Sequence, residues 1–302
     1  MSFDPRIDRP LLGILLMAAF CVLAPFADSL AKLLGGTIPV IQIVTFRFAI
    51  QLLILLPVAV LSRRDLRMSG RSLAWLFLRS ILHIIGIGAM FLSLLYLPLA
   101  EAIAIAFVEP FLLLLLAWLV LKEHIGPHRL SACAVGFVGT MLVIQPSLAN
   151  VGVVALLPLI VAVAFAGFMI VTRHLTTRAD PVTLQAISGG MALAVLGVVL
   201  LLATPYDVKA LTLIAPSRPD WTLLVALGVL GTLAHLIMTW SLKFAPTATL
   251  APVQYLEIPF ATLIGWMIFG DLPNGLAALG ILITVAAGLY IMMRERRLAQ
   301  TA

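Results

Sequence analysis

Eight ionisable residues lie within long apolar stretches of this sequence, where a charge needs a physical reason. A charged side chain at the centre of a hydrocarbon layer costs about 2.5–3.5 kcal/mol on insertion scales. Each of these residues therefore needs a partner, a water-filled cavity or a neutral form. The eight are Asp28, Arg47, Arg79, His83, Glu101, Glu109, His235 and Glu257.

Glu109 and Glu257 are the leading candidates for a central site. Each lies about ten residues into its apolar stretch, hence near the middle of a helix that crosses a bilayer. Each is close to a proline, Pro110 or Pro259, which lacks an N–H group and frees a backbone carbonyl nearby. A carboxyl group at this depth could bind a substrate ammonium, carry a proton, or stay protonated and donate a hydrogen bond. The alternative is a structural ion pair, such as Glu109 with Arg47, that orders two helices.

Helical spacing adds neighbours to these two acids. Glu101 and Glu109 share a helix face through four-residue steps, and Gln254 lies three residues before Glu257. His83 is too deep to reach the head groups, so we expect it to serve a cavity or a hydrogen bond. We predict these substrate-binding residues: His83, Glu101, Phe107, Glu109, Gln254, Tyr255 and Glu257.

Two arginines within the apolar stretches are candidates for an ion pair or an anion site. Arg47 lies well inside the second stretch. Arg79 lies near the cytoplasmic end of the third, so we expect its long side chain to snorkel to the head groups. A phosphorylated cargo would want several inward-facing cations, and only these two could serve, which counts against such a cargo.

The sequence lacks the motifs of intramembrane enzymes and of ATP-driven machines. It contains no Gly-x-Ser-x-Gly elbow, no His-Glu-x-x-His pair and no P-loop. Cys21 and Cys133 both lie in apolar segments, which is typical of small buried residues and not of a disulfide or a metal cluster. We therefore expect no catalytic residue, no metal and no cofactor, and we predict that the chain is not an enzyme. An intramembrane enzyme, and a channel or receptor, are kept as rival classes.

The elements that position these residues must be membrane helices. Of 302 residues, 63% are hydrophobic and 11% are charged, and the mean hydropathy is +1.17. A soluble domain carries about 25% charged residues, so lipid is the solvent that fits. Backbone polar groups in lipid must be paired within their own segment or in a closed barrel, and these stretches are too long and uniformly apolar for barrel strands.

Ten stretches satisfy the need of a membrane helix for about 20 mostly apolar residues. Glycines and prolines mark the breaks between them. The first stretch is longer than the apolar core of a signal peptide, so we expect it to stay as a span. The predicted spans are 11–34, 39–61, 72–95, 99–121, 129–145, 151–171, 181–203, 221–242, 247–270 and 274–293.

Positive charges orient the chain in the membrane. With the N-terminus inside, fourteen Lys and Arg residues fall in the inside segments, whereas the outside loops hold three, namely Lys32, Lys209 and Arg218. This difference predicts cytoplasmic N- and C-termini in an inner or plasma membrane. It also explains the net charge of +6 without a nucleic-acid partner.

An internal repeat links the fourth and ninth spans. Residues 93–123 align without a gap to residues 241–271, at a constant offset of 148. The matched pairs are Ser93–Ser241, Tyr96–Phe244, Pro98–Pro246, Phe107–Tyr255, Glu109–Glu257, Trp118–Trp266 and Glu123–Asp271.

The repeat predicts an inverted architecture. Five spans per half is an odd number, so the two halves insert with opposite orientations. Inverted repeats are frequent in secondary transporters, with the substrate site near the midplane between the halves. The sequence therefore predicts an all-α integral membrane protein of ten helices, built from two inverted five-helix repeats at residues 11–145 and 151–293.

Five motifs also resemble those of a known family. PVIQIVTFRF is similar to its second span, VEPFLLLLLAWLVLKE and LEIPFATLIGWMIFGD to its fourth and ninth, and GFVGTML and GILITVAAGL to its fifth and tenth. The family is the drug/metabolite transporter superfamily, in particular its ten-helix EamA-type exporters. The resemblance covers nearly the whole chain. It departs at Gly189, where Arg47 would repeat, and at Asp271, where Glu is more usual.

The resemblance implies a secondary transporter of small organic solutes that works by alternating access. Glu-Pro in the fourth span, with His and aromatic residues in the third, resembles bacterial exporters of aromatic and other neutral amino acids. We therefore expect amino-acid export, with other metabolites, drugs, or sugars and nucleotide sugars as alternative cargoes. The expected partners are the solute and membrane lipids, and the chain is a monomer or homodimer. Proton coupling stays open.

Overall fold

A computed structural model describes residues 9–121, 127–203 and 211–301 of the chain. These residues form helices joined by short loops and contain no strand. The described part does not include Arg6, Lys122, Glu123 and Lys209, or the side chains of Arg129, Cys133, Arg296 and Arg297.

Six helical segments are long and apolar enough to cross a membrane. They are α1 (Pro10–Leu34), α2 (Val40–Leu61), α3 (Gly70–Ser93), the segment Leu148–Thr176, α8 (Pro181–Ala203) and α9 (Arg218–Phe244). The segment Leu148–Thr176 contains the last four residues of α6 (Pro127–Val151), the short 3₁₀ helix η1 (Gly152–Leu156) and α7 (Leu157–Thr176). The chain is therefore an all-helical protein with several membrane-spanning helices, as the composition predicts.

Two of the predicted spans are broken in the middle. The stretch 99–121 forms α4 (Leu99–Ala106) and α5 (Glu109–Leu121), and the stretch 247–270 forms α10 (Thr247–Gln254) and α11 (Glu257–Phe269). The helix bounds of the second pair are those of the first moved by 148 residues. Pro110 and Pro259 explain the breaks, because a proline cannot bond to the carbonyl four residues earlier and its ring crowds that carbonyl.

Two further helices complete the bundle. α6 (Pro127–Val151) runs past the predicted end at residue 145, and α12 (Gly275–Thr301) covers the last predicted span. The helix continues through Pro146, since a single proline removes only one backbone bond and membrane helices tolerate that loss. The six long apolar segments correspond to six of the ten predicted spans. The broken pairs, α12 and α6 up to residue 147 fall outside these segments.

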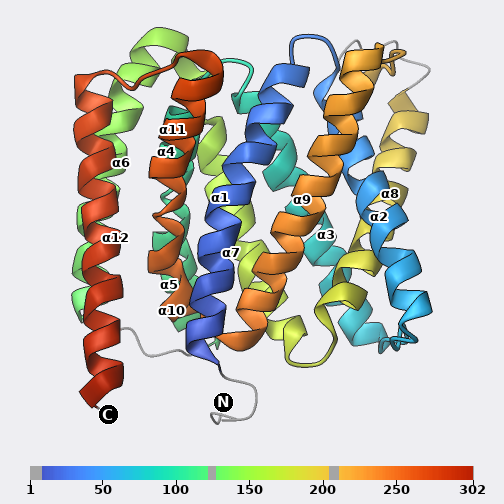
Figure 1. Cartoon of the computed structure of the whole chain (residues 1–302), viewed down its shortest axis with the longest axis horizontal. Coiled ribbons are helices and arrows are strands. Elements are labelled where there is room, and N and C mark those ends of the chain that lie inside the picture. Colours follow the sequence, from blue (N-terminus) through green and yellow to red (C-terminus); the bar gives the residue numbers. More distant parts are fainter. Residues whose placement is uncertain (1–8, 122–126, 204–210, 302) are drawn as a thin grey trace.

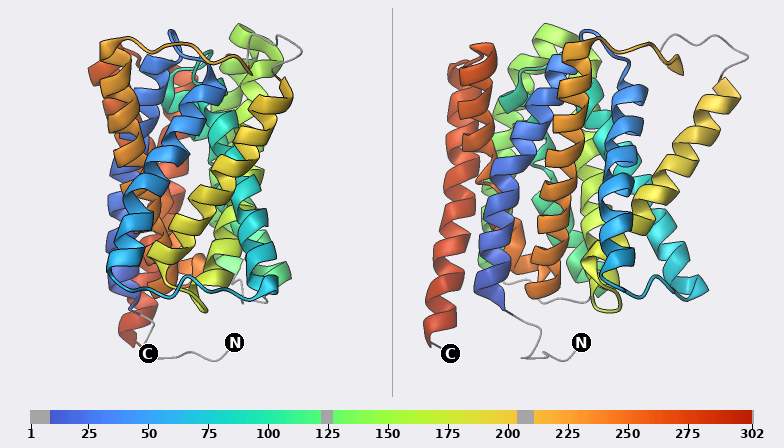
Figure 2. Two further views of the ribbon diagram at one scale, coloured as in Figure 1. Left: turned by 90° about the vertical axis from the view of Figure 1, so that its right-hand side faces the viewer. Right: turned by 45° about the vertical axis from the view of Figure 1, so that its right-hand side comes forward.

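The helices pack in pairs that join the early and late parts of the chain. α1 packs on α9, α2 on α8, α3 on α7, and α6 on α12. Figure 1 shows α6 and α12 side by side at one edge of the bundle, and the right-hand view of Figure 2 shows α12 at the same edge. α1 begins and α12 ends at the same end of the bundle (Figure 1).

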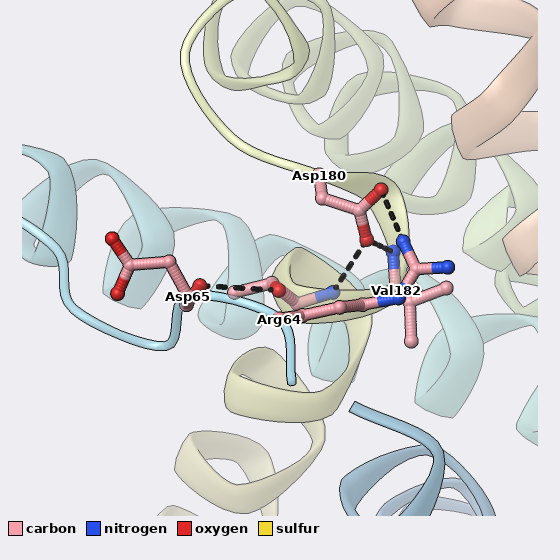
Figure 3. Close-up of polar contacts among 5 residues, drawn as sticks. Arg64, Asp65, Asp180 and Val182 are labelled. Carbon is pink, nitrogen blue, oxygen red and sulfur yellow. Dashed lines mark hydrogen bonds and ion pairs between the residues drawn. The ribbon is translucent and has the colours of Figure 1, made fainter. Parts of the chain in front are cut away.

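Two ion pairs join the early and late parts of the chain. One lies at the end of α1 and the other just after the end of α2. Lys32, in the last turn of α1, lies 3.2 Å from the carboxylate of Asp271. Arg64, just after α2, lies 2.5 Å from the carboxylate of Asp180 (Figure 3). Asp180 also accepts hydrogen bonds from the backbone N–H groups of Val182 and Thr183, so it caps the start of α8.

Candidate functional site

A cavity of about 60 Å³ lies inside the bundle, between α1, α2, α3, α7, α9 and the two broken helix pairs. Its aromatic lining consists of phenylalanines from four helices or their ends. Its polar lining combines acids, a guanidinium, an imidazole and an amide. These residues are Phe20, Phe91, Phe107 and Phe165, and Asp28, Arg47, Glu109, His235, Gln254 and Glu257.

Arg47 forms the basic end of this cavity. Its Nη2 lies 2.9 Å from Nδ1 of His235 and 3.4 Å from Nε2 of His83, and 3.5 Å from the carbonyl oxygen of Gly231. Nδ1 of His235 is also 2.9 Å from that carbonyl oxygen. It can donate to the carbonyl in one tautomer or accept from Arg47 in the other, but not both. The hydrogen bonding of this end therefore has two alternative arrangements.

Aromatic rings enclose the two imidazoles. The rings of His83 and His235 are 4.6 Å apart, and Phe168 lies 4.4 Å from His83. Phe20 contacts His235 edge-on, and Phe165 contacts both imidazoles. The basic end is thus polar at its centre and apolar around it, which is typical of small-molecule sites.

The broken helices form the acidic end of the cavity. Glu109 begins α5 and Glu257 begins α11, so both carboxyls lie next to a helix break. Oε2 of Glu109 accepts a hydrogen bond of 3.2 Å from Nε2 of Gln254, the last residue of α10. Glu109 pairs with this amide, and the ion pair with Arg47 that the sequence offered as an alternative is not among the contacts of the described residues.

Several buried polar atoms at both ends lack a hydrogen-bond partner among the described residues. A buried polar atom without a partner loses the free energy of its hydration, commonly about 1–3 kcal/mol. Such atoms are rare unless a ligand or water completes them. Those at or beside the cavity are Nη1 of Arg47, Nδ1 of His83, Nε2 of His235, Oε1 of Glu109 and Oε1 of Gln254.

Arg79 does not snorkel, contrary to the expectation from the sequence. Its side chain is fully buried, and hydroxyls of Thr172, Ser188 and Thr239 accept its hydrogen bonds. Its guanidinium also lies 4.4 Å from the ring of Phe168. These hydroxyls come from α7, α8 and α9. They provide the polar surroundings that lipid head groups would provide for a snorkelling side chain. Arg79 does not line the cavity.

The structure brings together five of the residues predicted from the sequence and leaves four aside. Arg47, Phe107, Glu109, Gln254 and Glu257 line the cavity. His83 touches Arg47 but does not line it, and Arg79 lies in its hydroxyl cluster. Glu101 is buried on α4 away from the lining, and Tyr255 packs its ring on Phe107 and against Gly288.

Sequence reasoning missed two polar residues of the lining. Asp28 and His235 were both visible as ionisable residues in apolar stretches, and that signal alone could have placed them at the cavity. The phenylalanines Phe20, Phe91 and Phe165 carried no comparable signal, because phenylalanine is common throughout membrane helices.

The model of the EamA-like transporter family matches this chain over residues 11–145 and again over 152–293. A solved structure described only as the crystal structure of a protein shares the fold, with a TM-score of 0.67 and 20% identity over 96% of this chain and 98% of that one.

Curated relatives are transporters of several small molecules. A riboflavin transporter of Brucella anthropi is 29% identical over 290 residues, covering 95% of this chain and all of the relative. The pseudopaline exporter CntI of Pseudomonas aeruginosa is 27% identical, covering 95% and 96%. An S-adenosylmethionine uptake transporter of Rickettsia prowazekii is 24% identical, covering 89% and 88%. These relatives support a membrane transporter of a small molecule, and none of them supports amino-acid export.

Proposed function

The chain belongs to the EamA-like transporter family, and on that premise we propose that it is a secondary transporter of a flat heteroaromatic metabolite, with riboflavin as the first candidate. The observation that carries the proposal is the central cavity, where phenylalanines surround buried polar atoms that lack partners among the described residues. The relatives named as riboflavin transporters supply the candidate.

The chemistry of the cavity fits such a substrate. A flat ring system can stack on Phe20, Phe91 or Phe165, and aromatic stacking of a heterocyclic base is worth about 1–3 kcal/mol per ring. Carbonyl oxygens at its edge could accept hydrogen bonds from Arg47, and ring N–H groups could donate to the acids. In this proposal Arg47 and Glu109 hold opposite edges of the substrate.

The remaining residues predicted from the sequence take supporting roles. Phe107, Gln254 and Glu257 contact the substrate, and His83 orients Arg47. Glu101 and Tyr255 hold the broken helices in place, and Arg79 binds the surrounding helices. These assignments replace the expectation that all seven predicted residues touch the substrate and that Arg47 and Arg79 serve an ion pair or an anion site.

We propose ten spans in two inverted repeats, 11–145 and 151–293. Each broken pair, α4 with α5 and α10 with α11, then counts as one span, and α6 and α12 are each one more. The pairing of helices supports this arrangement. In the two repeats α1 is equivalent to α7, and α3 is equivalent to α9. The packed pair α1–α9 is therefore equivalent to the pair α7–α3, and both pairs are present. The pairs α2–α8 and α6–α12 each map onto themselves.

The mechanism that follows is alternating access in the inner membrane. One half opens the cavity to one side, and its inverted counterpart opens it to the other. At about 60 Å³ the cavity is smaller than the roughly 300–1,000 Å³ of ligand pockets, so it must widen to admit a metabolite. The charge distribution of the sequence supports cytoplasmic N- and C-termini.

Transport by the purified chain in proteoliposomes tests the substrate. We expect saturable riboflavin entry that exceeds entry into protein-free liposomes, with competition from related flavins and none from phenylalanine or tryptophan. Amino-acid transport without flavin transport would overturn the proposal in favour of the expectation from the sequence. S-adenosylmethionine in the same panel would reveal a different heterocyclic substrate.

A pair of phenylalanine variants tests the role of the cavity. Phe165→Ala removes a ring from the lining, and we expect the KM for riboflavin to rise at least about fivefold, the effect of losing one stacking contact. Phe77→Ala removes a ring that is 48% exposed on α3 and should leave KM unchanged. Equal effects of the two substitutions would contradict binding in this cavity.

A further inference from the structure

A groove runs between α6 and α12 on the outside of the bundle, away from the central cavity. Its volume is about 430 Å³. The two helices lie side by side at one edge of the molecule (Figure 1), so the groove is separate from the proposed transport site. Its walls are Ser131, Ala132 and Val135 of α6 and Ile283, Ala286 and Ala287 of α12.

Small residues where the two helices meet create this groove. A Cβ atom on Gly139 would lie 2.7 Å from the carbonyl oxygen of Gly280, so α6 and α12 touch backbone to backbone there. Nearer the start of α6 the contact is made by Ala132 and Ala287, which are both buried. Their methyl groups are too short to fill the space between the flanking side chains, and a hollow is left along the contact.

One end of the groove is polar. Tyr290 lines this end, and its hydroxyl lies 3.2 Å from Nδ1 of His128. Arg294 follows Tyr290 by four residues, which places it one turn further along the same face of α12. Its side chain is partly buried, and neither ion pair of the described residues involves it. The groove therefore joins an apolar channel to a cation that has no acidic partner in the described part of the chain.

We propose that this groove binds one acyl chain of an anionic phospholipid, with the lipid phosphate at Arg294. The walls are almost entirely apolar, and from Ile283 to Tyr290 they extend about 10 Å at 1.5 Å per residue, the length of part of an acyl chain. Basic residues between helices on the cytoplasmic side attract anionic head groups.

Native mass spectrometry of the purified full chain tests the site, with phosphatidylglycerol and phosphatidylcholine of identical acyl chains as probes. We expect phosphatidylglycerol to be retained roughly fivefold more than phosphatidylcholine, the selectivity of one basic residue near an anionic head group. Ala286→Trp places a large ring in the groove from an exposed position and should reduce retention of both lipids. Arg294→Gln should remove the preference for phosphatidylglycerol over phosphatidylcholine, while the acyl chain of either lipid still binds in the groove.

Two matched variants and one mass measurement make the test specific. Leu282→Trp adds the same ring on α12 at a position 66% exposed that does not line the groove, and Arg67→Gln removes a charge from the α2–α3 loop. Neither should alter lipid retention. Equal retention of the two lipids by the unmodified chain, or retention that Ala286→Trp leaves unchanged, overturns the proposal. So does a dimer that Ala286→Trp splits into monomers, because the groove would then hold a second copy.

Discussion

The ring of Phe107 lies 5.5 Å from the ring of Tyr255, measured between centroids, and the two residues end α4 and α10 at equivalent breaks 148 residues apart. Two equivalent residues can touch only near the axis that relates them. On the proposed inverted arrangement, that axis therefore passes between these rings and beside the cavity that Phe107 lines. The acids Glu109 and Glu257 follow two residues later on each side, so both face the region of the axis.

Arg47 is predicted to be essential for transport, whereas Arg79 is predicted to stabilise the fold. Arg47→Gln removes a buried guanidinium whose Nη1 has no partner among the described residues and could donate to the substrate. A hydrogen bond to a charged group contributes about 1.5–3 kcal/mol. We expect riboflavin transport to fall at least tenfold, by roughly the factor of such a bond, with little change in expression. Arg79→Gln is the matched control, since its partners are hydroxyls outside the cavity.

For Arg79→Gln we expect a lower melting temperature in detergent and a nearly normal KM in whatever protein remains folded. The comparison is made by measuring both quantities for both variants. A reversed pattern, in which Arg79→Gln raises KM and Arg47→Gln only lowers stability, would place the substrate in the hydroxyl cluster.

Glu109 is predicted to carry the proton if transport is coupled to a pH gradient. Its Oε1 has no partner among the described residues, and its Oε2 accepts from an uncharged amide. Glu109→Gln imitates the protonated acid but cannot release a proton. We expect this variant to keep riboflavin exchange between the two sides and to lose accumulation driven by a gradient. Accumulation that is unchanged at every pH would eliminate the role.

The contact between α6 and α12 is predicted to tolerate no added methyl group at Gly280. A Cβ atom there would meet the carbonyl oxygen of Gly139, which is backbone and cannot turn away. Gly280→Ala should therefore destabilise the protein by about 1–3 kcal/mol, the usual effect of overpacking. Gly88→Ala on α3 meets nothing within 4 Å and should leave the melting temperature unchanged or slightly raised. Thermal unfolding in detergent measures both.

The Arg64–Asp180 contact combines an ion pair with a helix cap, and the two contributions are separable. Asp180→Ala removes both, with an expected loss of about 1 kcal/mol for the cap and about 0.2–1 kcal/mol for the partly exposed pair. Arg64→Gln removes only the pair. Asp180→Ala should thus lower the melting temperature more than Arg64→Gln. Equal losses would mean that the backbone N–H groups of Val182 and Thr183 find other partners.

The sequence predicted the helical membrane fold well because lipid leaves few alternatives. The spans around α1, α2, α3, α8 and α9 were within a few residues of the observed helices, since each is a continuous apolar run between prolines, glycines or charges. The breaks at Phe107 and Tyr255 were harder to predict, although Pro110 and Pro259 were seen. Proline interrupts one helix but is accommodated in another, as Pro146 is in α6.

The lining of the cavity was predicted in part, and the residues missed show what a sequence does not contain. Glu109, Glu257 and Arg47 were found because a charge in an apolar run stands out. Arg79 was misjudged because its hydroxyl partners come from three helices that are distant in sequence. The phenylalanines of the cavity differ from those facing lipid only in where their helices place them.

Labelling of engineered cysteines tests the central claim, that two oppositely inserted halves enclose the cavity. Leu95 and Lys243 are equivalent positions, 148 residues apart, just before the broken helices, and neither is buried. In a background with Cys21→Ser and Cys133→Ser, Leu95→Cys should react with a membrane-impermeant maleimide in intact cells. Lys243→Cys should react only after the membrane is permeabilised. Reaction of both cysteines from the same side would contradict the inverted arrangement and the mechanism built on it.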